Sequence, residues 1–195
     1  MVDGGEKLEK WRYLVEQHKT IFGWPSWRTQ KIVRETPTSA MAAGRQRLNS
    51  VVAERTELLL QVMDENDISI EIVRIRIQAW TQRPMEDITA TFEVLHQERW
   101  VCISRIDFSP PTPHPNIHWR KYRLPPEVNG SHIHLYADNA KIGDEAFKPA
   151  ANLPNASPLE SEPKSFRDVV KEIERHFHIS GLGELPPPDW NGRLV

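Results

Sequence analysis

The chain has 195 residues, 25 Lys/Arg against 27 Asp/Glu, a formal net charge of -2, and 38% hydrophobic residues. This composition is typical of a folded globular protein, and the near-neutral charge excludes a nucleic-acid binder that relies on charge alone. The lone Cys102 excludes an internal disulfide, and no apolar run approaches the roughly 18 residues of a membrane-spanning helix. We therefore expect a cytoplasmic protein without a membrane partner.

The front of the chain, residues 1–48, is predicted to be a helical N-terminal extension. Apolar residues recur at helical spacing over residues 6–22, and residues 38–48 predict a second short helix. The segment between them combines indole rings with basic side chains, which suits base stacking or anchoring of a protein partner, although burial against the sheet is equally compatible. The residues that would form this binding surface are Trp24, Trp27, Arg28, Lys31 and Arg34.

From residue 49 to residue 181 the periodicity predicts an α+β domain. Residues 54–63 with 68–80, and residues 87–96 with 99–108, predict two hairpins, and a fifth strand is expected at 130–138. The fold class is therefore an antiparallel sheet of about five strands, a meander packed by a C-terminal helix. This helix is predicted to start at the capping residue Ser165 and to end before Gly181. Residues 182–195 are Pro-rich and predict a passive tail or a segment that docks on a partner.

The sequence GSHIHLYAD, residues 130–138, holds the most pointed functional pattern. On a strand, alternate side chains share a face, so that His132, His134, Tyr136 and Asp138 would form one row. The structural explanation is a solvated or hydrogen-bonded strand face. A metal site or a catalytic site would need at least one further residue from elsewhere in the chain.

Two chemistries suit this row. In the first, His132 and His134 ligate zinc or manganese and a third ligand comes from Asp107, His114, His118 or the more remote Asp144. Such a metal with an open position would activate water against a phosphodiester. In the second, His132 and His134 act as metal-free base and acid, and Tyr136 or Arg123 stabilises the developing charge. Asp107 and Arg105 share a strand face, where a structural salt bridge is the simpler expectation.

Residues 99–179 resemble a family of uncharacterised small bacterial and prophage-encoded proteins. The shared features are the strand ending in RID at Arg105–Asp107, the proline-bounded loop with His114 and Asn116, GSHIHLY, GDEAF at Gly143–Phe147, and a terminal helix ending in HFHI. The resemblance implies an α+β fold and no established activity. Occurrence in mobile elements implies a toxin, antitoxin or phage-defence context.

Two function classes therefore stand at this stage. The first is a cytoplasmic accessory or effector protein of a prophage, phage-defence or toxin–antitoxin-like locus, which binds a protein or nucleic acid through the Trp/Arg front. The second is a small phosphodiesterase or ribonuclease centred on His132 and His134. Whether the protein is an enzyme stays open.

Overall fold

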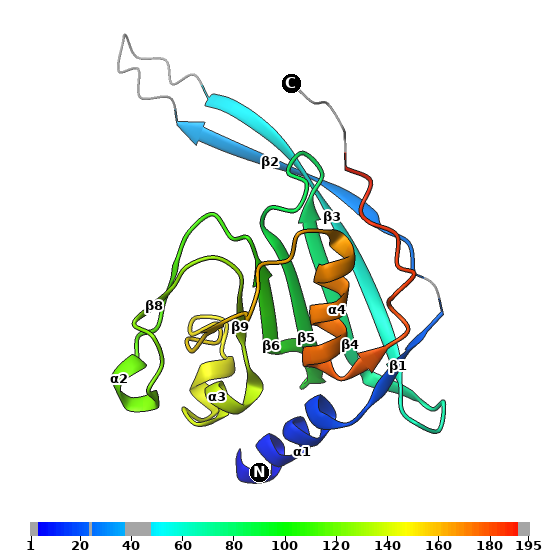
Figure 1. Ribbon diagram of the computed structural model, residues 1–195, viewed down its shortest axis with the longest axis vertical. Coiled ribbons are helices and arrows are strands. Elements are labelled where there is room, and N and C mark those ends of the chain that lie inside the picture. Colours follow the sequence, from blue (N-terminus) through cyan, green and yellow to red (C-terminus); the bar gives the residue numbers. More distant parts are fainter. Residues whose placement is uncertain (1–3, 24, 38–47, 191–195) are drawn as a thin grey trace.

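One large sheet with helices packed on it makes up the computed structural model, which describes residues 4–23, 25–37 and 48–190 (Figure 1). The helices are α1 (Gly4–Glu16), α2 (Trp119–Tyr122), α3 (Tyr136–Ala140) and α4 (Phe166–Phe177), with a short 3-10 helix η1 (Asp144–Phe147). The long strands are β2 (Arg28–Pro37), β3 (Leu48–Met63), β4 (Ser69–Trp80), β5 (Ile88–His96) and β6 (Arg99–Phe108). The short strands are β1 (Lys19–Phe22), β7 (His114–Pro115), β8 (Glu127–Val128), β9 (His132–His134), β10 (Ser157–Pro158) and β11 (Ile179–Ser180).

The α+β class is confirmed, but the expected strand number is wrong. The main sheet has nine strands in the order β10-β9-β6-β5-β4-β3-β1-β11, with β2 paired to β3. All its pairs are antiparallel except β1 with β11. The two predicted hairpins are confirmed as β3–β4 and β5–β6. The additional strands are mostly short edge segments, for which two to four residues give no periodic signal.

The front of the chain is less helical than predicted. A helix forms at α1, but the polar segment RTQKIVRETP is the strand β2, because its residues pair with β3 from Arg28↔Glu57 to Pro37↔Leu48. The predicted second helix falls mostly outside the described residues. Because β3 pairs with β4 only from Arg55 onward, residues 31–37 and 48–54 form a two-stranded ribbon that extends beyond the sheet (Figure 1).

The core lies between one face of the sheet and α4, as Figure 1 shows. Ser165 caps α4 as predicted, since its side chain accepts a hydrogen bond from the Asp168 amide at 3.2 Å. The apolar stripe of α4 is buried, and Phe177 meets Phe92 of β5 edge-to-face with ring centroids 5.7 Å apart. Among the described residues, no helix combines the length and apolar character needed to cross a bilayer.

The Pro-rich segment after β11 packs on this fold instead of extending away from it. Leu182 and Leu185 are buried, and the Trp27 indole donates a hydrogen bond to the Pro186 carbonyl at 3.0 Å. Phe166 of α4 contacts Trp27 and Trp190, with ring centroids 6.0 and 5.9 Å away. Residues 182–190 are therefore part of the folded body.

Candidate metal centre

The HIH sequence forms the short strand β9, which pairs with the end of β6. In this register His134 lies opposite Arg105, Ile133 opposite Ile106, and His132 opposite Asp107. Ile133 and Ile106 are buried in the core. Because side chains alternate along a strand, the two histidines, Arg105 and Asp107 all lie on the opposite face of the sheet.

A β-bulge in β6 decides this placement. Ser104 pairs with Phe92 and Cys102 with Glu93, so Ile103 is one extra residue in β6. Before the bulge, Val101 packs against the core, and after it Ile106 does. Without the extra residue, Arg105 and Asp107 would point into the apolar core.

The third histidine comes from the proline-bounded loop between β6 and β9. His114 lies in β7, which pairs with β8 through His114↔Val128. Asn116 fixes this loop, because its amide nitrogen donates to the carbonyls of Pro125 and Ala156, both at 2.8 Å, and its oxygen accepts from the Ala156 amide at 2.7 Å. The His114 ring thereby lies 4.6 Å from the His134 ring and 5.4 Å from that of His132, centroid to centroid.

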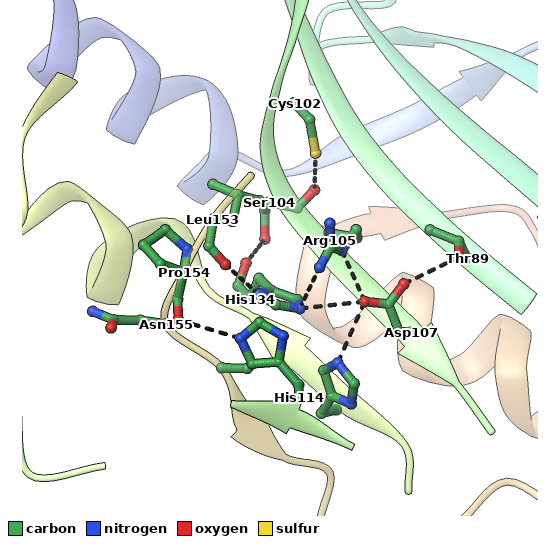
Figure 2. A network of polar contacts seen from close by, with 12 residues as sticks. Thr89, Cys102, Ser104, Arg105, Asp107, His114, His134, Leu153, Pro154 and Asn155 are labelled. Atoms are coloured by element: carbon green, nitrogen blue, oxygen red, sulfur yellow. Dashed lines mark hydrogen bonds and ion pairs between the residues drawn. The ribbon is translucent and has the colours of Figure 1, made fainter. Parts of the chain in front are cut away.

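Asp107 stands at the centre of the cluster (Figure 2). Its Oδ2 lies 3.4 Å from Nε2 of His132 and 3.2 Å from Nε2 of His134, and it accepts a hydrogen bond from Nε of Arg105 at 2.8 Å. Its Oδ1 accepts from the Thr89 hydroxyl of β5 at 3.0 Å. The expected salt bridge between Arg105 and Asp107 is confirmed. It belongs to the histidine cluster and is not separate from it.

The three histidines offer one ligand nitrogen each, and these nitrogens all lie within 4.8 Å of one another. In every ring one nitrogen faces a backbone carbonyl. The pairs are His114 Nε2 with Pro154 at 3.2 Å, His132 Nδ1 with Gly130 at 2.8 Å, and His134 Nδ1 with Leu153 at 2.6 Å. A carbonyl only accepts, so each of these nitrogens carries a proton. In a neutral ring the second nitrogen then presents a lone pair.

Burial keeps two of these imidazoles neutral. Desolvation lowers the pKa of His134 to about 4, although the adjacent Asp107 carboxylate opposes this shift, and desolvation also lowers the pKa of His114. Burial alone would raise the pKa of Asp107, but its contacts with the His132 and His134 rings and the charge of Arg105 outweigh this effect. The pKa of Asp107 therefore lies well below its usual range, and the carboxylate is ionised.

Solvent reaches the cluster from one side. The side chains of His132 and His134 are 3% and 0% exposed, whereas Asp107 retains 15% and Arg105 13%. His114 is half-buried. The open side of the cluster is therefore formed by His114, Asp107 and Arg105. A cavity of about 670 Å³ elsewhere, beside α1 and the β5–β6 turn, includes none of these residues in its lining.

Other residues predicted from the sequence lie apart from the cluster. The expected strand 130–138 ends at His134, because Tyr136 starts α3 and its hydroxyl donates to the Leu8 carbonyl of α1 at 2.5 Å. Tyr136 therefore does not line up with the histidines, and the predicted row is wrong beyond His134. The remaining two ligand candidates contact other residues. Asp144 of η1 forms an ion pair with Lys7 of α1. His118 immediately precedes α2, and its ring contacts that of Tyr122. Arg123 ends α2.

The residues of the predicted Trp/Arg surface differ in how far they are buried. Trp27 is half-buried against Phe166, while Arg28 and Lys31 are exposed on β2. Arg34 belongs to β2, but its side chain is outside the described part, as is Trp24 altogether. Arg28 and Lys31 are therefore the described part of this surface that is open to a partner.

Comparisons with protein-family models, with curated proteins and with solved structures found no match for this chain. The resemblance to prophage-encoded proteins therefore stays a prediction, and the function has to be argued from the site itself.

Proposed function

We propose that His114, His132 and His134 bind one divalent metal ion, and that the protein is a metal-dependent hydrolase of phosphate esters. The observation that carries the proposal is the arrangement of the three imidazoles: one ligand nitrogen of each ring lies within 4.8 Å of the others, and one nitrogen of each ring is fixed by a backbone carbonyl. Protein histidines that ligate metals nearly always donate their second ring N–H in this way, which fixes the tautomer and the ring orientation.

The spacing is close to that of a metal-bound site. Bonds of about 2.0–2.1 Å from zinc to imidazole place tetrahedral ligand atoms roughly 3.3 Å apart. The nitrogens here lie within 4.8 Å of one another, so binding requires each ring to move inward by less than about 1 Å. Imidazole ligands suit zinc, and manganese is compatible when a carboxylate is added.

The protonation states suit metal capture at neutral pH. A histidine must be neutral to bind a metal, and the lowered pKa values of His134 and His114 supply neutral rings. Metal binding would also relieve an unfavourable contact at His132. Its Nδ1 faces the Gly130 carbonyl and its Nε2 faces the Asp107 carboxylate, so a neutral ring leaves one lone pair directed at an oxygen.

The chain's own groups have distinct roles in this proposal. Three imidazoles leave a fourth position, where a bound metal lowers the pKa of water and creates a nucleophile at neutral pH. Asp107, ionised and held by Arg105 and Thr89, is placed to accept a proton from that water. Arg105 is placed to contact an anionic substrate.

The test is metal binding, followed by hydrolysis. Zinc and manganese content and titration heats are measured for the untagged wild type, the double variant His132→Gln/His134→Gln, and the control His176→Gln, whose histidine lies on α4. We expect one metal per chain in wild type and control, and none in the double variant. Hydrolysis of p-nitrophenyl phosphate and bis(p-nitrophenyl) phosphate should follow the metal. Absence of metal binding by the wild type would refute the proposal.

We also propose partner binding through the ribbon of β2 and β3, because a specific feature supports it. The ribbon extends beyond the sheet, and β2 pairs with β3 alone among the described strands, leaving one backbone edge open to a partner. Lys31 in the ribbon and Arg28 earlier on β2 are exposed. The variant Arg28→Ala/Lys31→Ala should weaken binding of a single-stranded RNA oligonucleotide at least tenfold while metal binding persists; unchanged RNA affinity would refute it. A prophage or defence role remains a prediction from the resemblance.

A further inference from the structure

Arg105 occupies the direction from which a metal would bind His134. Its Nη2 lies 2.7 Å from His134 Nε2, the nitrogen whose lone pair would ligate the ion. The Nδ1 proton of His134 is committed to the Leu153 carbonyl, so Nε2 accepts the hydrogen bond from Arg105. Because one lone pair serves one partner, the guanidinium and the metal exclude each other at this nitrogen.

Replacing the Arg105 guanidinium by a metal ion at His134 changes the net charge of the site. The described residues of the cluster supply one carboxylate, Asp107, against the cation Arg105 when the imidazoles are neutral. A divalent ion raises the local charge from about zero to about +2 beside Arg105, Asp107 and His134, whose side chains are 15% exposed or less. Like charges at short range are costly when they are partly buried. An anion that contacts both cations removes this cost.

We propose that a phosphate monoester is the ligand of this site, bound jointly by the metal and by Arg105, so that metal and anion bind cooperatively. This inference rests on the proposed function, since it requires the metal. On metal binding, Nη2 of Arg105 leaves His134 and turns to the phosphate. The bond from Nε of Arg105 to Asp107 at 2.8 Å persists, and the end of the guanidinium still presents one hydrogen from each terminal nitrogen to an anion.

The number of unesterified oxygens on the anion favours a phosphate monoester over a phosphodiester or a carboxylate. Two terminal nitrogens of Arg105 form a planar fork that binds two oxygens of one anion, and the metal takes a third. A monoester phosphate has three unesterified oxygens and satisfies both. A phosphodiester or a carboxylate has only two, so it loses either part of the fork or the metal contact. The site therefore suits an enzyme that acts on terminal phosphates and not the phosphodiesterase predicted from the sequence.

The experiment measures Mn²⁺ affinity by titration calorimetry with and without methyl phosphate, dimethyl phosphate or acetate at matched ionic strength. We expect methyl phosphate to tighten Mn²⁺ binding about tenfold or more in the wild type, within the usual range of coupling between sites, and the other two anions to tighten it by less than about threefold. Equal coupling by dimethyl phosphate or acetate would overturn the monoester assignment.

Two variants separate the role of Arg105 from general charge effects. Arg105→Met removes the competitor for His134, so it should bind Mn²⁺ at least as tightly as the wild type without anion and show no gain from methyl phosphate. Arg74→Met, altered on the same sheet face but paired with Glu93, should behave as the wild type. If Arg105→Met does not fold, wild-type reciprocity decides, since saturating Mn²⁺ must tighten methyl phosphate binding by the same factor.

The outcomes distinguish the two proposals. Metal binding without any coupling to methyl phosphate overturns the inference and leaves the metal centre intact. Absence of Mn²⁺ binding to the wild type, with and without methyl phosphate, overturns both.

Discussion

The metal-free protein should lose stability between pH 7 and pH 5 because of His134. Its side chain is fully buried, it donates to the Leu153 carbonyl, and desolvation lowers its pKa from 6.5 to about 4. In the unfolded chain the same ring takes up a proton near pH 6.5. As the pH falls through this window the unfolded state binds a proton that the folded state refuses, so acid favours unfolding.

The size of the effect follows from the shift. Each pKa unit corresponds to about 1.4 kcal/mol, so the full displacement of the His134 pKa is worth roughly 3 kcal/mol. About 2 kcal/mol of this is lost by pH 5, where the unfolded ring is protonated and the folded ring still neutral. The lowered pKa of His114 acts in the same direction. The depressed pKa of Asp107 contributes only at more acidic pH, below its unfolded value of 3.8.

The assay is urea unfolding at pH 7, 6 and 5 with EDTA present. His134→Gln retains one donor for Leu153 and one acceptor for Arg105 but has no proton to take up, so its stability should change less with pH than that of the wild type. His176→Gln, altered outside the cluster, should retain a wild-type slope. A wild-type stability that is flat from pH 7 to pH 5, or equal slopes in wild type and His134→Gln, would refute the argument.

Three further substitutions test the parts that support the cluster. Asp107→Asn removes the charge that Arg105 and two imidazoles face, and urea unfolding at pH 7 should show a loss of about 2–3 kcal/mol; a loss below about 0.5 kcal/mol would contradict the network. Asn116→Ala frees the His114 loop from three hydrogen bonds, so zinc affinity should fall about tenfold while His132 and His134 still bind, and unchanged affinity would exclude His114 as a ligand. Lys19→Met leaves the carbonyls of Leu14, Val15 and Gln17 at the end of α1 without their donor, which should cost about 2–4 kcal/mol by thermal or urea unfolding; an unchanged midpoint would show that water replaces the ammonium.

The sequence predicted the elements whose side chains repeat with a clear period. The α4 helix follows from a capping serine and an apolar stripe, and β3 to β6 follow from long β-branched runs. Elements of two to four residues, such as β9 and β10, carry no period, so their places depend on tertiary pairing. The wrong prediction that Tyr136 lies on the histidine strand has a related cause. An alternating pattern suggested a strand through residue 138, whereas the backbone turns into α3 directly after His134.

The residues of the candidate site were predicted more fully than the backbone contacts that orient their side chains. His114, His132, His134 and Asp107 were all named from residue type and position, and the structure brings them together. The carbonyls of Gly130, Leu153 and Pro154 could not be named, because every residue has a carbonyl and only the fold decides which one meets a ring nitrogen.

The bulge at Ile103 shows how small a backbone change creates this site. In RWVCISRIDF the apolar residues that face the core are spaced by two up to Ile103 and then by three to Ile106. That single irregular interval is the sequence signal of an extra residue, and it switches Arg105 and Asp107 to the face of His132 and His134. A strand without it would point a cation and a carboxylate into the apolar core, at a cost that neither could offset there. The bulge instead places both side chains on the far face, where one carboxylate meets an arginine and two imidazoles beside a third.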